Sequence, residues 1–103
     1  MTRLPRRIGM SLSALVLSAA FSGCAASALQ QARLADDLHD DDVAVAQYTR
    51  VLRANPNSRD AQEGLDRAKI HASAAHLLRG REWYARGRFD DALVELQLAA
   101  ELN

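Results

Sequence analysis

The sequence predicts an all-α protein, and three features of its 103 residues lead to that fold class. After residue 24 the chain is rich in Ala, Leu, Arg, Asp and Glu, whereas Val, Ile and Thr, which favour strands, are sparse. Its apolar residues recur at steps of three and four, as they do along one face of a helix. No segment alternates apolar and polar residues in the manner of a half-buried strand. Helix is therefore the only regular structure that this part of the chain supports.

The first two expected helices are separated by a polar run of four residues. The first covers about residues 28–38 and ends at His39-Asp40-Asp41-Asp42, whose carboxylates suit the positive end of a following helix. The second covers about 43–54 and ends before Pro56, which lacks an amide hydrogen and clashes with the preceding turn. One face of this second helix carries its expected core residues, Ala44, Tyr48, Val51 and Leu52.

The third expected helix begins after Ser58, a good N-cap residue, and is long. No breaker precedes Gly80, and no convincing stop precedes Gly87. A narrow stripe of mostly small residues along this helix allows other helices to approach closely: Ala61, Leu65, Ala68, Ala72 and Ala75.

The last expected helix covers about Phe89 to Leu102 and has Asp90 and Asp91 in its first turn. Its expected buried residues are Ala92, Leu93, Leu96, Ala99 and Ala100.

Residues 42–56 and 90–103 are similar to each other when Ala44 is aligned with Ala92. Both resemble the second helix of a tetratricopeptide repeat, in which a small residue, a large apolar residue and another small residue pack on the partner helix. The matching positions are Ala44, Tyr48, Val51 and the closing Pro56 in the first copy, and Ala92, Leu96 and Ala99 in the second.

The helix and turn before the second copy also match this family, through Gly80, Trp83, Gly87 and Phe89. The first copy departs from the pattern, since Ala32, Ala35, His39 and Asp41 stand at the corresponding places. The copies are 48 residues apart where one repeat has about 34. The surplus, between Arg59 and Ala72, fits an elongated helix that joins tetratricopeptide-like antiparallel pairs in a fragment of an α-solenoid. An unrelated antiparallel bundle with alanine-rich seams is the alternative.

Residues 1–23 have the three-part plan of an export signal. Three arginines precede an apolar run of about 14 residues, which is shorter than the roughly 20 that span a bilayer. The lone cysteine, Cys24, follows Ser22-Gly23, and this segment resembles the lipobox of bacterial lipoproteins, although Phe21 stands where leucine is usual. The alternative is a plain secretory signal with an incidental buried cysteine.

The lipobox resemblance implies that the signal peptide is cleaved before Cys24 and that fatty acyl chains are attached to this cysteine. Residues 24–27 then form a lipidated tether, and residues 28–103 form the helical repeat segment, which looks truncated at its C-terminal end. Ala25 stands where an aspartate would retain a lipoprotein in the inner membrane. The resemblance therefore implies an outer-membrane lipoprotein that faces the periplasm.

Charge and motifs argue against several classes of function. Without the signal, ten basic and 13 acidic side chains leave a net charge of −3, which does not suit nucleic-acid binding. No serine lies in a glycine-framed elbow, and there is no glycine-rich phosphate loop, so we expect neither an enzyme nor a cofactor. The acidic run at 39–42 lacks the calcium-loop pattern, and His71 and His76 are five residues apart rather than the four of a zinc pair. We therefore expect no metal site and interpret both histidines as surface or packing residues.

The resemblance implies a scaffold that binds other envelope or secretion-system proteins and no small-molecule substrate. In tetratricopeptide proteins the first helix of each pair presents the binding side chains, here Leu29, Arg33 and Asp36 in the first copy and Leu77, Arg81 and Tyr84 in the second. The order of lipobox, degenerate repeat and long helix also resembles the N-terminal helical region of outer-membrane secretins, which serve type II secretion and type IV pili. The alternative is a structural spacer without a recognition groove, which the long helix from Ser58 favours.

Overall fold

The computed structural model describes residues 27–103, so the predicted signal peptide and Cys24 lie outside the described residues. Within that range the fold is all-α, with four helices that pack in sequence order. The first helix is described over residues 27–37, and it is followed by α2 (Asp41–Ala54), α3 (Arg59–Ala85) and α4 (Phe89–Leu102). The predicted α4 has the observed bounds. The second helix begins two residues earlier than predicted because Asp41 and Asp42 form its first turn.

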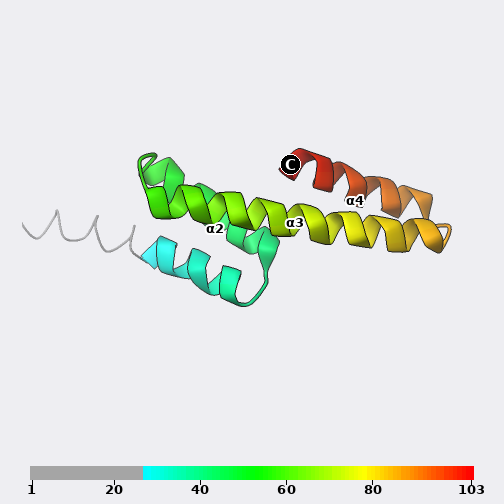
Figure 1. The fold of residues 1–103 in the computed structure, drawn as a ribbon, viewed down its shortest axis with the longest axis horizontal. Coiled ribbons are helices and arrows are strands. Elements are labelled where there is room, and N and C mark those ends of the chain that lie inside the picture. Colours follow the sequence, from blue (N-terminus) through cyan, green and yellow to red (C-terminus); the bar gives the residue numbers. More distant parts are fainter. Residues whose placement is uncertain (1–26) are drawn as a thin grey trace, which may run out of the picture.

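Helix α3 is the element that joins the two halves of the fold. It has 27 residues, which at 1.5 Å per residue makes it about 40 Å long. The Ala61 amide donates a hydrogen bond to the Ser58 side chain, which confirms the predicted N-cap. Figure 1 shows the first helix and α2 beside the N-terminal half of α3, while α4 folds back along its C-terminal half. The prediction of one long joining helix is therefore confirmed.

The two halves are helix–turn–helix units whose turns have the same hydrogen bonds at an offset of 48 residues. In the first turn the Asp40 amide donates to the Ala35 carbonyl at 2.9 Å, and in the second the Arg88 amide donates to the Trp83 carbonyl at 2.9 Å. His39 and Gly87 both have positive φ, 56° and 75°. Such a residue ends a helix in the left-handed conformation, which glycine adopts at the least cost. We call residues 27–54 the first unit and the C-terminal half of α3 with α4 the second unit.

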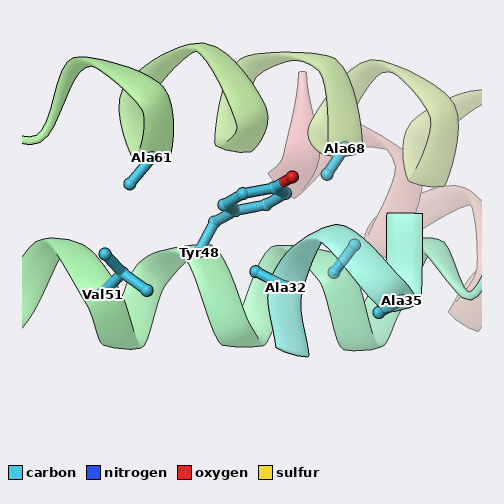
Figure 2. Packing of buried hydrophobic residues seen from close by; sticks show 7 residues of the cluster. Ala32, Ala35, Tyr48, Val51, Ala61 and Ala68 are labelled. Atoms are coloured by element: carbon cyan, nitrogen blue, oxygen red, sulfur yellow. The ribbon is translucent and has the colours of Figure 1, made fainter. Parts of the chain in front are cut away.

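The core of the first unit is centred on Tyr48, which is 1% exposed. Figure 2 shows its ring pointing from α2 toward α3, between Ala61 and Ala68. Gly64 provides the space for this ring, because a Cβ atom there would overlap the ring carbons. The remaining buried members of this cluster are Ala32, Ala35, Ala44 and Val51. The predicted face of α2 is thus confirmed, with Leu52 partly buried at its edge.

The seam between α3 and α4 is made mostly of small residues. Ala92 and Ala99 are buried on α4, and Gly80 faces the Ala92 carbonyl and the Leu96 side chain. The Ser73 hydroxyl donates a hydrogen bond across this seam to the Ala99 carbonyl at 3.0 Å. The side chains at the seam are short, which allows the two backbones to lie close together.

Part of the predicted burial of α4 is wrong. Leu93 is 56% exposed and Ala100 is also exposed, while Leu96 is 37% exposed and only borders the seam. Within residues 27–103, α4 packs chiefly on α3, and one helix neighbour buries only a narrow stripe. Trp83 is partly buried, with the Arg88 and Arg86 guanidinium groups 4.6 and 5.4 Å from the centre of its ring.

Candidate functional site

The three predicted partner-binding residues of the first unit make contacts within the chain. Arg33 forms an ion pair with Asp60 of α3 at 2.9 Å. Asp36 accepts hydrogen bonds from the Tyr48 hydroxyl at 3.3 Å and from Arg67 of α3 at 3.5 Å. Leu29 is partly buried against the core of the first unit. These residues therefore help to seat the N-terminal half of α3 on the first unit.

The corresponding residues of the second unit remain exposed. Leu77, Arg81 and Tyr84 lie 48 positions after Leu29, Arg33 and Asp36, and Tyr84 is 64% exposed. The spacing of 77, 81 and 84 places them along one side of α3. Of the six predicted partner-binding residues, the three in the first unit therefore contact other parts of the chain, and the three in the second unit are exposed.

Three apolar residues of α4 extend this open region. Phe89, Leu93 and Leu96 are spaced four and three apart, so they follow one side of the helix. The Phe89 and Tyr84 rings pack edge to face with centroids 5.2 Å apart, and Leu96 contacts the helix at Gly80. The two rows are therefore continuous. We call them together the uncovered face: Leu77, Arg81, Tyr84, Phe89, Leu93 and Leu96.

Several apolar positions of the first unit are more buried than their equivalents in the second unit. Tyr48 is 1% exposed and its equivalent, Leu96, is 37% exposed. Val45 is partly buried, whereas its equivalent, Leu93, is 56% exposed. The physical reason is that the N-terminal half of α3 covers the first unit, and no segment of residues 27–103 covers the second in the same way.

A second cluster, at the junction of three helices, was not expected from the sequence. His76 of α3 is 5% exposed. Its Nδ1 lies 2.6 Å from Glu95 of α4, and its Nε2 lies 2.9 Å from Asp42 of α2. Each ring nitrogen lies within hydrogen-bond distance of a carboxylate oxygen, and Nδ1 also lies 2.9 Å from the Arg79 Nη2 atom. The Arg79 Nε also donates to the same Glu95 oxygen, at 3.2 Å.

The charge state of this cluster follows from two opposing effects. Burial disfavours the imidazolium, but the hydrogen bonds to Glu95 and Asp42 outweigh it and raise the pKa of His76 above its ordinary value. The hydrogen bond from His76, helped by Arg79, lowers the pKa of Glu95. The hydrogen-bonded pair of His76 and Glu95 therefore ties α4 to α3, and Asp42 ties both to the start of α2.

One signal in the sequence could have located His76. It continues a row of buried small residues at steps of four, Ala68, Ala72 and Gly80, so its position alone puts it in the seam. A histidine in such a row needs polar partners from the neighbouring helices.

Comparisons with known proteins do not assign the chain to a family, since no family model, curated protein or solved structure matches it. Within residues 27–103, no helix combines the length and hydrophobicity needed to cross a bilayer. The same range contains no group of three or more His, Cys, Asp or Glu side chains arranged to hold a metal ion.

Proposed function

We propose that the chain is a lipid-anchored scaffold of the bacterial envelope that binds another protein on the uncovered face. The observation that carries this proposal is the difference in burial between equivalent positions of the two units, above all Tyr48 and Leu96. Neighbouring exposed side chains such as Tyr84, Phe89 and Leu93 make an apolar strip, and such strips mark interaction sites in soluble domains.

A tetratricopeptide-like array is the fold that we propose for the two units. The shared turn hydrogen bonds, the positive φ at His39 and Gly87, and the small residues at Ala44 and Ala92 support it. The offset of 48 residues departs from the family's spacing, and the continuous α3 accounts for that departure.

The anchor of the proposed scaffold is Cys24, with outer-membrane attachment and a periplasmic orientation inferred from the lipobox and Ala25. The resemblance to the secretin N-terminal region suggests a secretion or pilus-assembly partner. Expressed with its signal in a bacterium, the chain should incorporate labelled fatty acid and enter the detergent phase, because acyl chains add a large buried apolar area. Cys24→Ser should abolish both results, and equal labelling of the two proteins would contradict lipidation.

Binding on the uncovered face can be tested by photocrosslinking in cells that make the lipidated protein. A photoreactive amino acid at Leu93 should form an adduct with a defined protein, because this side chain is exposed at the centre of the apolar strip. The matched control is Arg50, which is exposed on α2 and outside the strip. The same adducts from both positions, or none from Leu93, would contradict the scaffold.

The alternative function, a spacer without a recognition groove, is favoured by one observation, the 27-residue length of α3. A spacer depends on that length and makes no use of side chains at Leu93 or Tyr84. Substituting both with serine would leave a spacer active and would inactivate a scaffold.

A further inference from the structure

We propose that the partner inserts a helix that resembles the N-terminal half of α3 into the uncovered face. This inference rests on the proposed function and names the class of partner: a helix of another protein with a stripe of small residues. The partner helix also carries an acidic side chain that pairs with Arg81 and apolar side chains opposite Tyr84 and Phe89. Each of these features follows from comparing the two units position by position.

The small residues follow from the way α3 covers the first unit. Its contacting residues Ala61 and Ala68 are fully buried, and Gly64 receives the Tyr48 ring. The equivalent of Tyr48 is Leu96, which projects from the corresponding place on α4. A covering helix with short side chains at these three places can approach the second unit as closely as α3 approaches the first.

The acidic residue follows from the ion pair at the edge of the first unit. Arg33 pairs with Asp60 of α3 at 2.9 Å. Arg81 lies at the equivalent position of the second unit, is exposed, and has no carboxylate within ion-pair distance among residues 27–103. A carboxylate of the partner helix at the place of Asp60 would complete the same pair.

The apolar residues follow from the positions at which the two units differ in chemistry. The first unit presents Asp36 to Arg67 at 3.5 Å and Asp41 to His71 at 3.9 Å. The equivalents of these two aspartates are Tyr84 and Phe89, which are aromatic and exposed. A basic residue opposite these rings would lose its carboxylate partner. The partner helix should therefore have apolar residues where α3 has Arg67 and His71.

A peptide copied from this chain can probe that chemistry directly. The probe has residues 56–72 with Arg67→Leu and His71→Leu, and its reference is the unsubstituted peptide of equal length. Fluorescence anisotropy with the full-length lipidated chain in detergent should show at least tenfold tighter binding of the probe. Equal affinity of the two peptides would overturn the proposed apolar contacts.

Variants of the protein locate the binding site. Leu93→Asp should weaken binding of the probe at least tenfold, whereas Val94→Asp should change it less than twofold. Val94 is a matched control because it is 55% exposed and adjacent, but it points away from the strip. Arg81→Asp should weaken binding about threefold, as expected for an exposed ion pair, and Asp60→Arg in the probe should restore it.

Further results would overturn the inference. If Arg33→Asp weakens binding of the probe and Arg81→Asp does not, the peptide displaces α3 from the first unit. If the protein self-associates and Leu93→Asp abolishes this association, a second copy of the chain occupies the uncovered face. Unchanged binding by Leu93→Asp would place the peptide elsewhere. If no peptide binds while Leu93 still crosslinks a protein in cells, the scaffold stands and the partner chemistry proposed here is wrong.

Discussion

At the scale of single residues, two glycines of α3 with similar surroundings have different roles. Gly64 lies under the Tyr48 ring, which is 1% exposed and whose hydroxyl donates a hydrogen bond to Asp36 of the first helix. A Cβ atom added to Gly80 would lie 2.8 Å from the end of the Leu96 side chain. Leu96 is 37% exposed, so its side chain can rotate outward. The first site has no room for a methyl group, and the second can make room.

We predict that Gly64→Ala destabilises the protein and that Gly80→Ala does not. Alanine gains about 1 kcal/mol over glycine in a helix interior. Overpacking at Gly64 costs about 1–3 kcal/mol because the Tyr48 ring cannot move aside, so the net effect there is unfavourable. Urea unfolding should show a lower midpoint for Gly64→Ala and an equal or higher one for Gly80→Ala. A higher midpoint for Gly64→Ala would show that the ring does not rest on this glycine.

The histidine junction predicts a pH dependence of stability. The pKa of His76 is raised in the folded state, so its contribution is complete below the unfolded value of about 6.5 and is lost as pH rises through the folded pKa. The pKa of Glu95 is lowered, so its contribution holds above about 4.5 and is lost as pH falls through the folded pKa. The groups that face His76 are Asp42 from α2, Glu95 from α4 and Arg79 from α3.

We therefore expect the free energy of unfolding to fall from pH 6 to pH 9 in the unaltered chain. His76→Gln should remove this fall, because glutamine does not titrate, and should be less stable at pH 6. The control is His71→Gln, since His71 is half-exposed and 3.9 Å from Asp41. Parallel stability curves for His76→Gln and the unaltered chain would show that the junction is not the titrating group.

The burial of single residues is predicted correctly for the small-residue stripe of α3 and wrongly for Leu93 and Leu96 of α4. Ala61, Ala68 and Ala72 are buried as expected, because a stripe at steps of three and four has one consistent direction. Leu93 is predicted to be buried from its hydrophobicity, and Leu96 also from its match to Tyr48 in the repeat alignment. Whether a large apolar residue is covered depends on the number of neighbouring helices, and periodicity carries no information on that number.

At the scale of elements, helix boundaries were predictable wherever a local signal marks them. Ser58 caps α3 through its side chain, and Gly87 ends the same helix region in the left-handed conformation. The start of α2 lies two residues before the predicted one because Asp40, Asp41 and Asp42 are consecutive N-cap candidates, and residue type alone does not distinguish them. The junction at His76 was missed because it needs residues from three elements whose packing the sequence does not state.

The seam between α3 and α4 supports a prediction about element packing. Ala92 is 2% exposed and faces α3 at Gly80, so a leucine there must push the helices apart at a cost of about 1–3 kcal/mol. Ala85 is exposed at the end of α3, so Ala85→Leu should cost less than about 0.5 kcal/mol. Similar urea midpoints for Ala92→Leu and Ala85→Leu would contradict the observed pairing of α3 with α4.

At the scale of the whole molecule, α3 carries both units, so their stability is expected to be coupled through it. Its N-terminal half is held by Tyr48, and its C-terminal half is held by Ala92 and Ala99 of α4. Two helical units that share one helix are expected to unfold together while that helix remains intact. The sequence predicted the shared helix from the absence of a breaker between Ser58 and Gly80.

Ile70 offers a way to break that coupling without touching either core. It is 63% exposed between the two halves of α3, and proline there removes one helical hydrogen bond at a cost of about 3 kcal/mol. Trp83 is the only tryptophan and lies in the second unit, so its fluorescence follows that unit, whereas circular dichroism follows all helices. In the unaltered chain and in Ile70→Ala the two urea transitions should coincide. In Ile70→Pro the Trp83 transition should move to lower urea than the circular dichroism transition, because α4 then rests on a half-helix with no support from the first unit. Coincident transitions in Ile70→Pro would show that the units remain coupled without a continuous α3, for example through the contacts of Asp42 with His76 and Arg79.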